Sequence, residues 1–182
     1  MVKEQTATFA NGCFWCTEAV FKRLKGVTSV ISGYTGGKRE NPSYDQVASG
    51  ATGHAESLQI TFNPEIISYN ILLDIFWTTH DPTTLNKQQY DVGTEYRSAI
   101  FYHDDAQKKI AIRSKETLEK SHIYKDPIVT EITPFTEFYP AEESHKDYYD
   151  NHRNAPYCRV IIEPKVKKLL EKFTDKVKEE YK

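Results

Sequence analysis

The sequence predicts an α/β (α+β) fold: a two-layer sandwich with helices on one face of a mixed sheet and a split βαβ, ferredoxin-like core. Two observations lead to this prediction. Segments with strand-like alternation and segments with helical spacing follow one another in the order βαββαβ, with extra elements after them. The 182 residues contain no internal repeat and no interdomain linker, and this length suits one hydrophobic core. We therefore expect a single domain over residues 1–182, closed by a C-terminal helix.

The first three elements form the start of the predicted core. Residues 5–10 alternate between apolar and polar side chains, as a half-buried strand does. A turn at residues 11–12 leads into a helix over residues 13–25, where apolar side chains recur at helical spacing and Gly26 ends the helix. Residues 27–33 are rich in β-branched side chains and predict the second strand.

Two long polar loops interrupt the second half of the core. Residues 33–53 form a loop rich in Gly, Pro, Ser and Tyr, before a strand at residues 55–62. A helix begins with a proline and covers residues 64–79, and a second loop covers residues 81–97 before a strand at residues 99–102. Loops of this length within a compact domain commonly carry function.

The C-terminal part adds further elements to the core. An aspartate caps a helix at residues 104–120, and a strand follows at residues 128–132. Residues 142–151 predict a short helix and residues 158–162 an extended run. A closing helix follows a proline and covers residues 165–181.

Charge and composition exclude several classes of protein. The net charge of -2 provides no basic excess to attract nucleic acid or an anionic membrane. No segment approaches 18 consecutive apolar residues, and the first residues lack the apolar core of a signal peptide. We therefore expect a cytoplasmic protein, in which three cysteines are reactive, metal-bound or buried rather than paired in a disulfide scaffold.

The most informative local feature is Cys13, which lies where a strand turns into a helix. Unpaired amide donors and the positive end of the helix dipole meet there, and they lower the pKa of a thiol. Cys13 is therefore a candidate nucleophile, although a buried and inert cysteine is the common alternative. The spacing to Cys16 also matches half of a zinc site, but Cys158, His145 and His152 form no compact second half, so we expect no metal.

Eight sequence strings occur in an order that resembles peptide methionine sulfoxide reductase of the A type. They are GCFWC at 12–16, GYTGG at 33–37, NPSYDQV at 41–47, GHAE at 53–56, FNP at 62–64, FWTTHDPTTLNKQ at 76–88, DVGTEYRSAIFY at 91–102 and FYPAEESHKDYY at 138–149. The resemblance covers about residues 8–173. It implies the same α/β sandwich, with Cys13 as the nucleophile and Phe14 and Trp15 as the apolar wall for the substrate's S-methyl group.

The resemblance also implies the groups that receive the sulfoxide oxygen. Glu56 matches the acid that protonates this oxygen, Tyr44 and Tyr96 match hydroxyls that bind it, and Asp91 orients the site or the substrate backbone. The chemistry requires such groups, because a sulfoxide becomes a good electrophile only when its oxygen gains a proton. A carboxyl in apolar surroundings has its pKa raised and stays protonated near neutral pH.

The resemblance predicts reduction of the S epimer of methionine sulfoxide, free or in proteins, which repairs oxidative damage. Cys13 becomes a sulfenic acid, a second thiol converts it to a disulfide, and thioredoxin reduces the disulfide. No nicotinamide-binding fingerprint occurs, so we expect no cofactor and electrons that come through a partner protein. The net charge, as argued above, predicts no nucleic acid or membrane partner. A general thiol-disulfide oxidoreductase or peroxidase is the alternative function, and a zinc-stabilised binding module is the alternative from another class.

Two positions depart from the family pattern. Many members have Gly in place of Cys16 and Gln in place of Glu95, so neither role can be transferred from the family. The resolving thiol is either Cys16, three residues from the nucleophile, or Cys158, which has the family position; proximity slightly favours Cys16. A role for His145 in supporting the site stays open.

Overall fold

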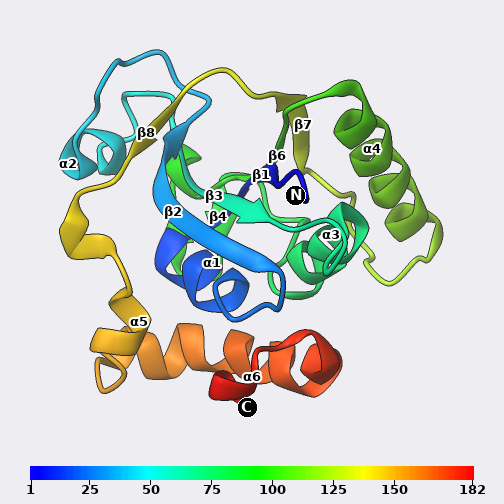
Figure 1. The fold of residues 1–182 in the computed structure, drawn as a ribbon. Coiled ribbons are helices and arrows are strands. Elements are labelled where there is room, and N and C mark those ends of the chain that lie inside the picture. The colour runs from blue at the N-terminus through cyan, green and yellow to red at the C-terminus, as the bar shows by residue number, and fades with distance from the viewer.

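The computed structural model describes all of residues 1–182 and contains a six-stranded sheet in the order β7-β6-β1-β3-β2-β8 (Figure 1). These strands are β1 (Gln5–Asn11), β2 (Val27–Thr35), β3 (Ala55–Phe62), β6 (Ser98–Tyr102), β7 (Glu131–Pro134) and β8 (Phe138–Pro140). Two further strands, β4 (Lys87–Gln88) and β5 (Asp91–Val92), pair with each other. The helices are α1 (Phe14–Phe21), α2 (Tyr44–Ala48), α3 (Tyr69–Thr78), α4 (Asp105–Lys120), α5 (Tyr148–Asn151) and α6 (Glu163–Phe173).

The central strands have the predicted ferredoxin-like order. Strand β1 pairs antiparallel with both β3 and β6, and β3 pairs antiparallel with β2. Strand β7 pairs parallel with β6, which makes the sheet mixed. The predicted fold class is therefore confirmed.

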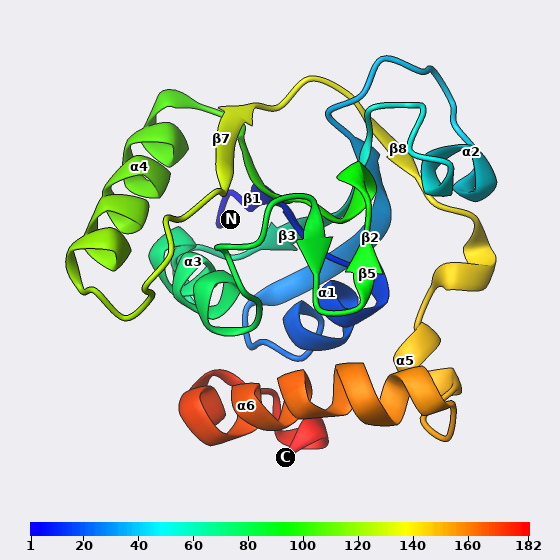
Figure 2. The same ribbon diagram turned by 180° about the vertical axis from the view of Figure 1, so that it is seen from behind.

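A hydrophobic core joins the sheet to helices α1 and α3. Its buried members include Phe9 from β1, Phe21 from α1, Ile60 from β3 and Phe76 from α3. Helix α6 adds a further layer beyond α1, as both views show (Figures 1 and 2), and its Leu169 belongs to the same core. Helix α1 is consequently covered on both sides, and almost all of its residues are buried.

Local capping explains where several helices begin. Asp104 caps α4 by accepting a hydrogen bond from the Gln107 amide, as predicted. Helix α3 begins at Tyr69 rather than at residue 64, because the Ser68 side chain caps it. Inside the predicted loop at residues 33–53, Ser43 and Gln46 form a capping box that begins the short helix α2.

Four predictions for the C-terminal region were wrong in detail, beginning with the strand expected at residues 128–132, which is β7 at Glu131–Pro134. Residues Cys158–Ile162 form a π-helical turn that continues into α6, not an extended run. The predicted helix at 142–151 is divided into a short 3-10 turn, Glu143–His145, and α5, because Asp147 adopts a left-handed conformation. The closing helix ends at Phe173, after which two 3-10 turns follow.

Ion pairs fix the C-terminal region against α1. Lys22 contacts Asp147 and Asp150, and the almost fully buried Arg23 also pairs with Asp150. The guanidinium of Arg23 lies 4.6 Å from the Tyr181 ring centroid. These contacts hold α5 against the end of α1, and an apolar cluster brings the π-helical turn beside the start of the helix. No helix has the length and apolar character needed to cross a membrane.

Candidate active site

The turn before α1 places Cys13 at the N-cap position of the helix. Gly12 has a φ of 103°, and a Cβ at this position would lie 2.8 Å from the Gln88 side chain, so glycine allows the β4–β5 hairpin to pack against the turn. The Thr17 hydroxyl donates a hydrogen bond to Asn11 Oδ1 and fixes the other side of the turn. Cys13 is only 6% exposed.

Glu56 lies beside this helix start, on β3. Its Oε2 accepts a hydrogen bond of 3.0 Å from the Phe14 amide, and its side chain is 2% exposed. Burial raises the pKa of Glu56 to about 8, the Phe14 amide opposes this shift, and the charges of Asp91, Glu95 and Cys16 add to it. The carboxyl is therefore protonated at neutral pH and can act as a proton donor.

The two thiols at the helix start have opposite pKa shifts. Burial raises the pKa of Cys13 well above its usual value, and the hydrogen bond to Cys16 and the charge of Glu56 raise it further. The predicted lowering of the pKa of Cys13 was therefore wrong, because burial is the largest cause of its shift. The hydrogen bond from Cys13 lowers the pKa of Cys16 to about 7 against the effect of burial. Of the two thiols, Cys16 is therefore the one that loses its proton more readily.

Tyr44 and Tyr96 come from the two long loops that the sequence singled out. Tyr44 begins α2, and its ring centroid lies 6.4 Å from that of Phe14, whereas Tyr96 ends the 3-10 turn Thr94–Tyr96. Burial and then the charge of Glu56 raise the pKa of Tyr44 to about 12 and raise that of Tyr96 further. Both hydroxyls thus remain protonated donors close to Glu56.

Phe14 and Trp15 have different surroundings. Phe14 is fully buried and packs against Tyr34, at 5.8 Å between ring centroids. Trp15 is half-buried, and the Tyr148 ring stacks on it at 3.7 Å and 7°. Its indole N–H donates to Nδ1 of His145, so His145 acts as an acceptor that orients Trp15. This contact gives His145 the supporting position that the sequence left open.

Asp91 and Tyr157 complete the site, and Tyr157 was not among the predicted site residues. The Tyr157 hydroxyl donates to Asp91 Oδ2 at 2.7 Å and lies 3.8 Å from Cys16 Sγ. Its ring also meets the edge of Trp15. The sequence offered one indication of this position: Tyr157 directly precedes Cys158.

Comparisons with known proteins identify the family of this chain. Residues 5–178 match the family model described as peptide methionine sulfoxide reductase. The protein named peptide methionine sulfoxide reductase MsrA of Sulfolobus acidocaldarius is 55% identical over 172 residues, which cover 94% of this chain and 97% of that protein. The protein of the same name from Saccharolobus solfataricus is 55% identical over 174 residues, 96% of this chain and 97% of that one.

The chain belongs to the peptide methionine sulfoxide reductase family. Solved structures agree with this assignment. The reduced form of Mxr1 from Saccharomyces cerevisiae superposes with a TM-score of 0.80 at 36% identity, covering 86% of this chain and 90% of that one. Methionine sulfoxide reductase A of Corynebacterium diphtheriae has a TM-score of 0.74 at 29% identity, with 84% and 76% covered. The resemblance inferred from the eight sequence strings is confirmed.

The third cysteine of this methionine sulfoxide reductase lies next to the other two. Cys158 is fully buried, begins the π-helical turn, and shares an apolar cluster with Cys13, Cys16 and Ile161. All three cysteines are free thiols. No group of three or more His, Cys, Asp or Glu side chains is arranged to bind a metal ion.

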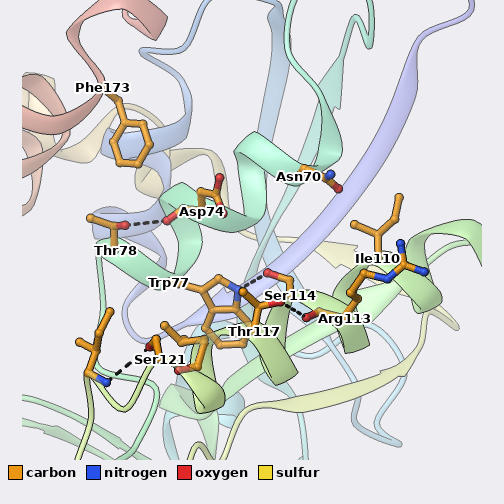
Figure 3. A pocket seen from close by; sticks show the side chains of 12 residues that line it. Asn70, Asp74, Trp77, Thr78, Ile110, Arg113, Ser114, Thr117, Ser121 and Phe173 are labelled. Atoms are coloured by element: carbon orange, nitrogen blue, oxygen red, sulfur yellow. Dashed lines mark hydrogen bonds between the residues drawn. The ribbon is translucent and has the colours of Figure 1, made fainter.

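A prominent cleft of the molecule lies elsewhere, between α3 and α4. Its volume is about 600 Å³, and its lining includes Trp77, Ser114 and Phe173 (Figure 3). The Trp77 indole N–H donates to the Ser114 hydroxyl across this cleft. None of the predicted site residues lines it.

Proposed function

We propose that this chain reduces the S epimer of methionine sulfoxide, free or in proteins, to methionine with Cys13 as the nucleophile. The observation that carries the proposal is a buried carboxyl, Glu56, hydrogen-bonded to the amide directly after Cys13 and protonated at neutral pH. Sulfoxide reduction requires a thiol that attacks the sulfur and, beside it, a donor that gives a proton to the oxygen.

The reaction begins when Cys13 transfers its proton along its hydrogen bond to the Cys16 thiolate. This transfer is uphill, because the pKa of Cys16 is lower than that of Cys13, and the attack on the sulfoxide that follows draws it forward. The Cys13 thiolate attacks the sulfoxide sulfur while Glu56 transfers its proton to the oxygen. In the adduct, Cys13 Sγ is bonded to the substrate sulfur, which carries the new hydroxyl. The hydroxyl then moves to Cys13 Sγ as the sulfur–sulfur bond and the substrate's sulfur–oxygen bond break, so methionine leaves reduced by two electrons and Cys13 is oxidised to a sulfenic acid.

The tyrosines and aromatic residues support the selectivity of this step. The hydroxyls of Tyr44 and Tyr96 are protonated donors for the oxygen, where negative charge is concentrated. Phe14 and Trp15 form the apolar wall for the S-methyl group, and Asp91 orients the site through Tyr157. A methyl site and an oxygen site together fix two substituents of a chiral sulfur, so one epimer reacts.

A second thiol then attacks the sulfenic acid, releases water and forms a disulfide, which a thioredoxin dithiol reduces. Cys16 is the favoured resolving thiol because it lies in the first turn after Cys13, and Cys158 is the alternative within the same apolar cluster. Support for the reductant comes from a related structure, Mxr1 in complex with Trx2, with a TM-score of 0.57 at 28% identity.

The test is turnover of racemic methionine sulfoxide with dithiothreitol, followed by chiral chromatography of methionine and of the remaining substrate. We expect methionine to accumulate until half of the racemate, the S form, is consumed. Equal depletion of both epimers would refute the proposed selectivity. Reduction of disulfides or peroxide without any sulfoxide turnover would instead favour the alternative, a general thiol oxidoreductase or peroxidase.

A further inference from the structure

The acid and one oxygen-binding hydroxyl of the proposed reaction come from two separate segments of the chain. Glu56 is the second residue of β3 (Ala55–Phe62), and Tyr96 ends the 3-10 turn Thr94–Tyr96. The turn packs against β3, so the two segments meet across a tertiary contact. Their relative position therefore depends on what joins the turn to the chain before Glu56.

The side chain of Arg97 joins these two segments. Its guanidinium donates one hydrogen bond of 2.9 Å to the Thr94 carbonyl, in the turn that Tyr96 ends. It donates a second hydrogen bond, of 3.0 Å, to the Gly53 carbonyl, which lies shortly before Glu56. A guanidinium is planar and holds its donors in a fixed fork, so it keeps the two carbonyls at a fixed separation.

The surroundings of Arg97 fit this bridging role. Its side chain is 12% exposed, and its Nε pairs with Glu131 on β7 at 3.4 Å, so the charge is neutralised on that side. Gly36 has a φ of 87°, and a Cβ at this position would lie 2.9 Å from a terminal nitrogen of the guanidinium. Glycine at this position therefore leaves the space that the guanidinium occupies.

No other donor replaces the Arg97 guanidinium between the two segments. The Gly53 carbonyl accepts a hydrogen bond from this guanidinium alone, and the only other donor to the Thr94 carbonyl is the Arg97 amide. Removal of the guanidinium therefore breaks the hydrogen-bonded link between the turn and the start of β3 and leaves packing alone to hold them.

We propose that Arg97 is a positioning residue that keeps the Tyr96 hydroxyl in register with the Glu56 carboxyl at the sulfoxide oxygen. This role rests on the proposed function, in which Tyr96 binds this oxygen and Glu56 protonates it. A displacement of about 1 Å between groups that act on one atom lowers a rate by about 10². Arg97 therefore acts on turnover through Tyr96 rather than through a contact of its own with the sulfoxide.

The first test is a double-mutant cycle on kcat and KM for methionine sulfoxide with dithiothreitol. In Arg97→Lys, which keeps the charge but cannot span two carbonyls, we expect kcat to fall by about tenfold with KM nearly unchanged, because donors aimed at the oxygen act mainly in the transition state. Tyr96→Phe should lower kcat by about tenfold, since Tyr44 remains as a second donor. The double variant should lose little more than either single variant, because no hydroxyl is left to position.

Glu131→Gln is the matched control, because it removes the ion pair of Arg97 and keeps both carbonyl contacts. Its kcat should stay within about twofold of the wild type, as expected for loss of a partly exposed ion pair. A loss of less than about threefold in Arg97→Lys would overturn the proposal. So would a loss of about 10² in the double variant, because independent effects multiply.

The second test needs no substrate and uses protein labelled with ¹³C in the tyrosine rings, with the Tyr96 signal assigned by its loss in Tyr96→Phe. We expect this signal to move in Arg97→Lys and to keep its wild-type position in Glu131→Gln. The signal of Tyr181, which packs on Arg23 at the end of α1, should stay unchanged in both and shows that the variants are folded. An unmoved Tyr96 signal in Arg97→Lys would overturn the proposal. A wild type inactive on methionine sulfoxide would refute the proposed function and leave this signal to decide the role of Arg97.

Discussion

The cleft between α3 and α4 and the buried centre at Cys13 differ in what each provides. The cleft offers about 600 Å³ of space and an indole, but no thiol lines it. The centre at Cys13 brings three thiols and a carboxyl into nearly dry surroundings. A large pocket is the usual first candidate for an active site, and here the chemistry lies apart from this one.

The carboxyls of the two regions differ in their charged neighbours. Glu56 is desolvated and also faces other negative charges, and its pKa rises to about 8. Asp74, in the cleft, has its pKa raised by burial alone. Reactivity therefore follows the combination of desolvation with nearby charges rather than the volume of a hollow.

The largest effect is expected from Cys13→Ser, which tests whether the buried centre carries the reaction. A serine hydroxyl does not form the thiolate that attacks sulfur, so methionine formation should be abolished. The measurement is methionine release from the sulfoxide with dithiothreitol. Activity within about tenfold of the wild type would contradict the assignment of the nucleophile.

The next effect is expected from Glu56→Gln, which removes the acid and preserves the shape. The rate should fall by ~10² or more, while iodoacetamide still alkylates the protein at Cys13. In the wild type, the rate should also fall as the pH rises through about 8, because Glu56 then loses its proton. If alkylation of Cys13 falls together with the rate, Glu56 has a structural role instead.

A smaller effect separates the two candidate resolving thiols. Wild type, Cys16→Ser and Cys158→Ser are treated with methionine sulfoxide in the absence of reductant, and disulfides are mapped by mass spectrometry. We expect a bond between Cys13 and Cys16 in the wild type, because Cys13 is the N-cap of α1 and Cys16 lies in the first turn of the helix. A bond from Cys13 to Cys158, with thioredoxin-dependent turnover unaffected by Cys16→Ser, would make Cys158 the resolving thiol.

The smallest effect on activity is expected in the cleft. Trp77 is 5% exposed and hydrogen-bonds Ser114, so Trp77→Ala should lower the free energy of unfolding by about 3 to 5 kcal/mol. Turnover per folded molecule should remain that of the wild type. Denaturant unfolding and the methionine assay measure the two quantities, and a selective loss of turnover would show that the cleft takes part in the reaction.

The sequence predicted best those elements that local interactions determine. The strand at residues 55–62 has the predicted bounds, and Asp104 caps α4 as expected, because alternation and capping act over a few residues. Residues 158–162 were misread, since Val160, Ile161 and Ile162 favour an extended backbone locally. Packing of Cys158 and Ile161 against the cluster of Cys13 selects a helical turn instead.

In the candidate site, too, local sequence patterns predicted some features, and others depend on packing between distant segments. The family resemblance of the sequence strings predicted that Cys13 and Glu56 belong to one site. It did not predict the raised pKa of Cys13. That shift depends on burial by segments distant in the chain, such as the π-helical turn that carries Cys158 and Ile161. Sequence reasoning considered the amide donors and the dipole of the helix start but not burial, and it therefore predicted the opposite direction.

The most direct test of the account is a single turnover without reductant. Wild-type protein is mixed with excess methionine sulfoxide, released methionine is counted per molecule, and the oxidised cysteines are identified by mass spectrometry after alkylation. The account predicts a burst of about one methionine per molecule, with Cys13 among the oxidised thiols and no burst in Cys13→Ser. A wild type that releases no methionine, or a burst that persists in Cys13→Ser, would contradict it.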